Sequence, residues 1–237
     1  MNHLESWLAE AQAEIRGLFG GNLLGLAVYG SAATADYLPG VSDINLVLIL
    51  KAVELADLER LRSFVQKHRK VKLSTPLMLT SEHIRTSADV FPIEYLEIKE
   101  KHRLLWGQDP FTKLRIDLKN LRHECEHELK GRLLRLRQSY LEIGKDAAPL
   151  RQLLLAAHNA NYPAFRAALR LKRVAPPVKK EEIDAALAKH YRVDGPVLQH
   201  LRDLKAGQAK RNRGELETLC QQYLHEVTRI AAQVDRL

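Results

Sequence analysis

The stretch GSAATADYLPGVSDINLVLIL, residues 30–50, contains most of the features that indicate the fold. An apolar run, LLGLAVY (residues 23–29), precedes it, and a second apolar run, INLVLIL (residues 44–50), closes it. Continuous apolar runs of this length are typical of strands that are buried on both faces. Pro39-Gly40 between them indicates a turn. The sequence therefore predicts two central strands of a sheet, joined by a loop that carries the polar residues.

The polar residues of this stretch form a pattern suited to an anion and a metal ion. Gly30 and Ser31 follow the first strand directly, where a glycine lets the backbone approach a phosphate, a serine adds a hydroxyl, and free backbone N–H groups are expected to point at the ligand. Asp43 and Asn45 begin the second strand, and their spacing of two places both side chains on one face. Mg²⁺ is usually bound by one or two carboxylates together with substrate phosphates. We therefore predict a phosphate-binding and metal-binding site here.

The first part of the chain mixes helical and strand patterns. Apolar residues recur every three or four positions after Leu4, and the segment GGN at residues 20–22 is expected to end that helix. Pro92 is expected at the start of the last strand or at a sheet edge. The predicted elements are helices over residues 4–18 and 55–65, and strands over residues 23–29, 44–50, 76–80 and 90–98.

The second part of the chain shows helical spacing alone. Apolar residues from Leu114 to about Ile143 predict one long helix, and helix-sized pieces follow it. The breaks between these pieces lie at residues 144–149, 174–180, 193–196 and 205–214. The expected fold class is therefore α+β. Residues 1–108 are expected to form a mixed β-sheet with flanking helices, and residues 109–237 an all-α helical bundle.

Composition and charge exclude several classes of protein. No apolar run approaches the roughly 18 residues of a membrane span, and the N-terminus does not have the pattern of a signal peptide. Cys125 and Cys220 stand far apart, which suits a reducing cytoplasm and offers no disulfide framework. The net charge is +8, with 12 Lys/Arg against 13 Asp/Glu in residues 1–107 and 25 against 16 in residues 108–237. The basic character belongs to the second half, as solvated helix faces or as a surface for an anionic partner.

The motifs Tyr29-Gly30-Ser31 and Ser42-Asp43-Ile44-Asn45 resemble those of the nucleotidyltransferase superfamily, which includes kanamycin and streptomycin adenylyltransferases and the minimal nucleotidyltransferases of toxin–antitoxin pairs. The stretch VFPIEYLEIKEKHRLLWGQDP (residues 90–110) resembles the segment that leads out of the catalytic domain in bacterial members. The resemblance implies a nucleotidyltransferase-like sheet followed by a helical bundle.

The resemblance also implies roles for individual residues. Gly30, Ser31 and Ser42 would contact the phosphates of a nucleoside triphosphate, ATP being the first choice. Asp43 and Asn45 would hold Mg²⁺ and act in catalysis.

Three departures from the pattern weaken the implied chemistry. Asn45 stands where the superfamily has a second acid, and Met78 stands where relatives with a Pro-Leu-Glu strand have a third. The Arg or Gly that often follows Gly-Ser is also absent, since Ala32, Ala33 and Thr34 stand there. Glu94 and Glu97, on the strand predicted next, are the substitutes that the sequence offers, and Glu94 is the candidate catalytic acid. An amide oxygen ligates Mg²⁺ but brings no charge, so a transfer that needs two metal ions would suffer most.

These observations leave three functions open. The first is Mg²⁺-dependent transfer of a nucleotide to a hydroxyl of a small molecule or protein. The second is an inactive nucleotide-binding or regulatory module, whose basic helical half contacts an acidic partner or another copy of the chain. The third is nucleic-acid binding, which the sequence disfavours because no aromatic residues interleave with the basic runs at residues 67–70 and 210–213.

The segment HECEH, residues 123–127, matches the pattern of zinc proteases. Its two histidines fall on the helix face opposite the apolar stripe of Leu121, Cys125 and Leu129. We therefore expect His123 and His127 to be exposed to solvent and to bind no zinc.

Overall fold

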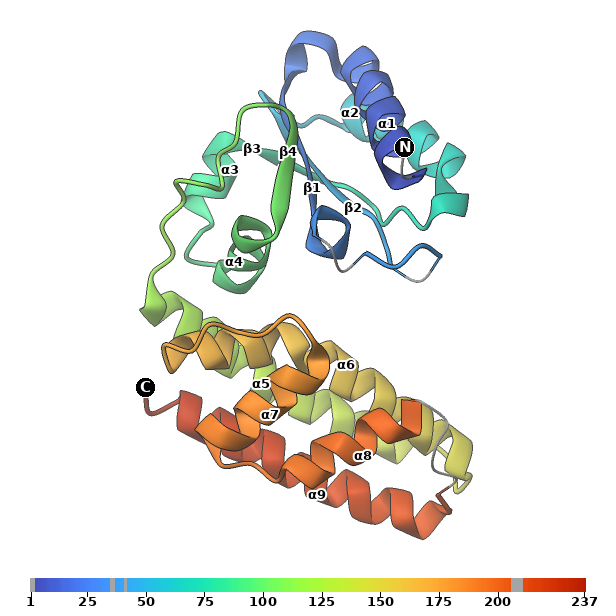
Figure 1. Cartoon of the computed structure of the whole chain (residues 1–237), viewed down its shortest axis with the longest axis vertical. Coiled ribbons are helices and arrows are strands. Elements are labelled where there is room, and N and C mark those ends of the chain that lie inside the picture. Colours follow the sequence, from blue (N-terminus) through green and yellow to red (C-terminus); the bar gives the residue numbers. More distant parts are fainter. Residues whose placement is uncertain (1–2, 35–36, 41, 206–210) are drawn as a thin grey trace. The chain divides into compact units, whose positions relative to one another are not determined.

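The computed structural model describes residues 3–34, 37–40, 42–205 and 211–237. The chain divides into two compact units, Met1–Ile116 and Asp117–Leu237, and each is described by itself (Figure 1). Within the described residues, no helix is both long enough and apolar enough to span a membrane.

The first unit is built on a four-stranded mixed sheet in the order β3-β2-β1-β4. The central strands β1 (Leu23–Tyr29) and β2 (Asn45–Leu50) pair antiparallel and are largely buried, as their apolar composition predicts. The outer strands are β3 (Leu77–Thr80), parallel to β2, and β4 (His102–Gly107), antiparallel to β1. The expected fold class of the first half, a mixed sheet with flanking helices, is confirmed.

Helices cover both faces of this sheet (Figure 1). On one face, Leu46, Leu48 and Leu50 pack with α1 (His3–Phe19) and α2 (Leu55–Lys67). On the other face, Val47 and Ile49 pack with α3 (Ser81–Thr86), with α4 (Pro92–Glu100) and with Phe111. The residues of β2 therefore alternate between the two faces with a period of two, and this alternation decides which of its side chains meet the candidate site.

Local signals account for the limits of the two long helices of this unit. The apolar stripe of α1 ends at Phe19, where Gly20 has a φ of +48°. At the start of α2, the Asp57 side chain accepts a hydrogen bond from the Glu54 N–H (3.1 Å), and the Asp57 N–H donates to the Glu54 carbonyl (3.0 Å). Such caps satisfy N–H groups that have no partner inside the helix.

The prediction of a strand over residues 90–98 is wrong, because α4 occupies this segment. Pro92 is the first residue of the helix, where its fixed φ fits the helical backbone and its missing N–H is not needed. The fourth strand is the next segment, β4, whose residues are mostly exposed or half-buried. An edge strand with one partner needs no continuous apolar run, which is why the apolar pattern did not indicate it.

The second unit contains helices only among its described residues. These are α5 (Leu118–Glu142), α6 (Ala147–Leu171), α7 (Lys180–Tyr191), α8 (Gly195–Lys205) and α9 (Arg213–Val234). The predicted helical region is confirmed, and part of the break expected at residues 205–214 lies outside the described residues.

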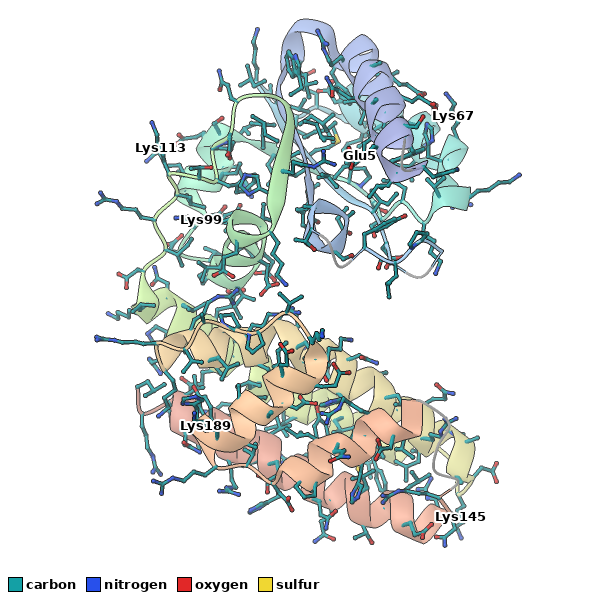
Figure 2. The ribbon with its side chains drawn as sticks, viewed as in Figure 1. Glu5, Lys67, Lys99, Lys113, Lys145 and Lys189 are labelled. Atoms are coloured by element: carbon teal, nitrogen blue, oxygen red, sulfur yellow. The ribbon has the colours of Figure 1, made fainter. Side chains whose placement is uncertain are left out.

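The first helix of this unit begins later than its apolar pattern suggested. Asp117 is its N-cap and accepts a hydrogen bond from the Lys119 N–H (2.8 Å). Leu114 and Ile116 instead pack on the core of the first unit beside Phe111. Lys99, labelled in Figure 2, extends from α4 and donates to the Leu114 carbonyl (2.7 Å), which holds this segment against the first unit.

Candidate functional site

The Gly-Ser bend lies at the end of β1, as the sequence predicts. β1 ends at Tyr29, and residues Gly30–Ala33 form a single 3₁₀ turn closed by the Thr34 N–H, which donates to the Ser31 carbonyl (3.0 Å). Gly30 has a φ of +75°, a conformation that favours glycine. The sequence therefore needs a glycine here for the turn itself.

The N–H of Gly30 is engaged with the protein. It donates to the carbonyl of Lys101, at the C-terminal end of α4 (2.8 Å). The Gly30 N–H is therefore not one of the free N–H groups that are expected to point at a ligand. The first N–H groups of a 3₁₀ turn have no acceptor within the turn, so those of Ser31 and Ala32 are the candidate anion donors.

Asn45 lies directly beside this bend. It pairs with Tyr29 in the ladder between β2 and β1. A Cβ atom placed on Gly30 would lie 3.1 Å from the Asn45 Nδ2 atom. The structure thus brings together two of the predicted site residues that are fifteen positions apart in the sequence.

Asp43 and Ser42 precede β2 in the loop. The side chain of Asp43 is exposed. Ser42 is used within the loop, because its N–H donates to the Leu38 carbonyl (2.9 Å) and its hydroxyl accepts from the Leu38 N–H (3.1 Å). Ser42 therefore shapes the loop that leads to Asp43.

The two glutamates offered as substitute acids lie on α4 and not on a strand. Glu94 is exposed in the first turn of this helix, and Glu97 is half-buried near its end. The Glu97 carbonyl accepts a hydrogen bond from the N–H of Lys101, the residue whose carbonyl binds Gly30. The C-terminal end of α4 is thus the part of that helix tied to the bend, while Glu94 lies at its other end.

Met78 lies on the face of the sheet opposite Asn45. It pairs with Leu48 and packs with α1 and α2. Within β3 the residues on the face of Asn45 are Leu77 and Leu79. The face that carries Asn45 is therefore apolar where it crosses β3, and the position of Met78 does not point a side chain toward the bend.

A row of polar side chains crosses this face, and one of its members, His102, was not indicated by the sequence. Tyr29 lies between Asn45 on β2 and His102 on β4, and the three residues are paired in register. His102 Nε2 lies 3.0 Å from Asp109 Oδ2, and Nδ1 lies 3.2 Å from the Lys99 carbonyl. Burial raises the pKa of Tyr29, so this phenol stays protonated at neutral pH.

Asp109 lies beside His102 at the end of this row and fixes the segment after β4 by hydrogen bonds. It accepts hydrogen bonds from the Phe111 N–H (2.9 Å), from the hydroxyl of Thr112 and from His102. Burial acts to raise the pKa of Asp109, but the hydrogen bonds of Thr112, His102 and Phe111 outweigh it and lower the pKa below its ordinary value of 3.8. The carboxylate form is thus part of the folded structure.

This depressed pKa predicts a loss of stability in acid. A carboxyl with a lower pKa in the folded state contributes its stabilisation above the unfolded value, and loses it as the pH falls from 3.8 through the folded value. We expect the free energy of unfolding to fall in that range, and to fall less in Asp109→Asn, measured by urea titration at a series of pH values. Asp89→Asn, at an exposed acid of the same unit, should follow the wild type. Identical pH profiles for all three proteins would contradict this role of Asp109.

The histidines of the HECEH segment are exposed on α5, as predicted from the helical spacing, whereas Leu121, Cys125 and Leu129 are buried. Burial and nearby acids, Glu124 first among them, raise the pKa of Cys125 to about 12, so this thiol is an inert core residue. In the part of the chain that the structure describes, no group of three or more His, Cys, Asp or Glu side chains is placed to hold a metal ion.

Comparison with known proteins identifies the fold. No family model matches the sequence, and no curated protein does. Among solved structures, the chain is similar to the crystal structure of spectinomycin adenyltransferase AAD(9) from Enterococcus faecialis with ATP and spectinomycin. The identity is 11%, the match covers 95% of this chain and 98% of that chain, and the TM-score is 0.58. The chain therefore has the nucleotidyltransferase fold, a mixed four-stranded sheet with flanking helices followed by a helical region.

Proposed function

We propose that this chain binds Mg²⁺ and ATP at the Gly30-Ser31 bend and transfers the nucleotide, at a reduced rate, to a hydroxyl of a small molecule or protein. The observation that carries the proposal is the contact between the bend and Asn45 at the ends of paired central strands, within a fold shared with an adenylyltransferase. In the proposed reaction the acceptor oxygen bonds to the α-phosphorus, the bond from that phosphorus to the oxygen bridging the β-phosphate breaks, and pyrophosphate leaves. The hydroxyl proton passes to water.

Asp43 in the loop before β2 and Asn45 beside the bend carry the kinds of oxygen atom that suit a metal ion arriving with its nucleotide. Asp43 supplies one carboxylate and Asn45 one amide oxygen, and Mg²⁺ in nucleotide sites takes one or two acids and completes its shell with phosphates and water. When bound there, Mg²⁺ would neutralise charge on the phosphates. The N–H groups and hydroxyl at Ser31 would contact the same phosphates.

The second candidate function is nucleotide binding without turnover. It is favoured by Leu77 and Leu79, which make the face of Asn45 apolar where a third acid would be needed. In this case the chain would act as a regulatory or interaction module that responds to the nucleotide. Transfer assays separate the two functions, because both predict binding and only the first predicts release of pyrophosphate.

Restoring the acid tests the proposed site. In Asn45→Asp, we expect the affinity for ATP in the presence of Mg²⁺ to rise about tenfold, because a second carboxylate adds charge to the metal site. Isothermal titration calorimetry measures it, and pyrophosphate release with spectinomycin as a trial hydroxyl acceptor measures turnover. The gain should disappear when EDTA removes Mg²⁺.

Gln66→Glu is the matched control, because Gln66 is exposed on α2 and the change adds the same charge away from the bend. Its affinity for ATP should equal that of the wild type. Absence of ATP binding in the wild type together with no gain in Asn45→Asp would refute a nucleotide site at the bend.

A further inference from the structure

The helical unit contains a pocket of its own. The pocket has a volume of about 350 Å³ and lies among α6, α7 and α8. This volume is at the lower end of the range of small-molecule sites. Its walls are formed by Leu155, His158, Asn159, Tyr162, Lys180, Glu181, Leu201 and Arg202.

Behind the pocket wall, polar side chains are buried in an otherwise apolar bundle. His158 is 3% exposed and Asp184 is 2% exposed. The hydroxyl of Tyr162 lies 3.0 Å from His158 Nε2 and donates to Asp184 Oδ2 (3.2 Å), which also accepts from Arg202. Burial, followed by the Asp184 carboxylate, raises the pKa of Tyr162, so its hydroxyl keeps the proton that it donates.

Two atoms of this cluster have no hydrogen-bond partner. They are His158 Nδ1 and Asp184 Oδ1, and both are fully buried. A buried polar atom without a partner costs about 1–3 kcal/mol, so such atoms call for an explanation. His158 also lines the pocket, so a ligand bound there would lie against its side chain.

The groups at the pocket mouth favour an anion. Lys180 Nζ lies 4.6 Å from the centre of the Tyr162 ring and donates to Asn159 Oδ1 (2.7 Å), and Arg202 lines the pocket from α8 while donating to the Asp184 carboxylate. Lys180 is also the first residue of α7, a helix of 12 residues whose N-cap residue makes no side-chain cap. The N–H groups of a first helical turn and the helix dipole both attract negative charge. Glu181 is the only acid that lines the pocket within the described residues, and its side chain is exposed.

We propose that this pocket binds the phosphate group of a small phosphorylated molecule. Lysine, arginine and an uncapped helix N-terminus together are the donors that proteins use for phosphate. Tyr162 and His158 form part of the pocket wall, and Leu155 and Leu201 leave room for a short apolar or sugar portion. The excess of basic residues in positions 108–237 would draw an anion toward this unit. This site is built from the helical unit alone and does not depend on nucleotide binding at the bend.

Titration of the full chain with inorganic phosphate tests the proposal. Ring signals of the histidines are followed by ¹H–¹³C NMR at constant pH and ionic strength, with chloride as the balancing anion. We expect the His158 signal to shift and to saturate with phosphate. His158→Gln assigns this signal by its loss, and Tyr162→Phe, which removes the hydroxyl beside Nε2, assigns it independently by its displacement.

Variants on α7 locate the site. Lys180→Gln is expected to weaken phosphate binding at least tenfold, whereas Lys180→Arg should stay within threefold of the wild type because it keeps the charge. Lys189→Gln is the matched control, since Lys189 is exposed at the other end of α7 and is labelled in Figure 2. It should bind phosphate as the wild type does.

Several results would overturn the assignment. They are an equal response of the His158 signal to chloride and phosphate, unchanged binding in Lys180→Gln, and tighter binding of acetate than of phosphate, which would assign the pocket to carboxylates instead. If Asp43→Asn abolishes both phosphate binding and the shift of the His158 signal, the phosphate binds at the bend and not in this pocket.

Discussion

Gly107→Ala is expected to destabilise the first unit by about 3–5 kcal/mol. Gly107 has a φ of +79°, and a Cβ atom at this position would lie 2.2 Å from the Leu24 carbonyl oxygen. That oxygen accepts a hydrogen bond from the Gln108 N–H (2.8 Å), so it cannot move aside without breaking the contact between β1 and the end of β4. The backbone conformation and the overlap therefore add to each other.

Urea unfolding followed by tryptophan fluorescence measures this effect, because the two tryptophans of the chain, Trp7 and Trp106, both belong to the first unit. Gly17→Ala is the control. Gly17 lies within α1, and a Cβ atom there would have no atom within 4 Å, so the change should be neutral or stabilise by up to about 1 kcal/mol. A loss below 1 kcal/mol in Gly107→Ala would show that the two strands separate more easily than their packing indicates.

Asp43→Asn is expected to lower the affinity for Mg²⁺ and ATP at least tenfold. On the proposed function, Asp43 is the carboxylate of the metal site, since Asn45 and the leucines of β3 bring no charge. Pyrophosphate release should fall by at least about a hundredfold, because the Mg²⁺ ion that neutralises the charge of the transferring phosphate would be bound less well. Calorimetry and a pyrophosphate assay measure the two effects.

The fold should not change in this variant. Asp43 is exposed, and surface substitutions of this kind usually alter stability by less than about 0.5 kcal/mol. Asp89→Asn removes the same charge from another exposed position of the first unit and should bind ATP as the wild type does. Equal affinities in the wild type, Asp43→Asn and Asp89→Asn would argue that any nucleotide binds elsewhere.

Local patterns were enough to predict most of the elements. The apolar runs that become β1 and β2 are buried on both faces, and continuous apolar runs of that length are typical of such strands. The helical spacing of α1, α2 and α5 follows directly from the stripe that each buries. The failure at residues 90–98 has a local cause too, because Pro92 suits the first turn of a helix as well as a strand edge.

The composition of the candidate site was harder to predict. The resemblance implied an acid position at Met78, but the register between β2 and β3 turns that side chain to the opposite face. The sequence did not predict His102 and Asp109 as neighbours, because β4 lacks a continuous apolar pattern and the two residues meet only after the chain turns. A shift of one residue in a strand register reverses every side chain, and no local pattern records that register.

Residue order along the chain thus settles the central strands, the glycine at the end of β1 and the helical character of the second half, because each depends on spacing and backbone preference within a few residues. Long-range pairing settles the rest: Asn45 against Gly30, the Gly30 N–H on the Lys101 carbonyl, and the apolar side chains of β3 on the same face. These contacts depend on which strands pair and in which register. Pairing and register are decided by how much apolar surface the whole unit buries, which no short segment determines.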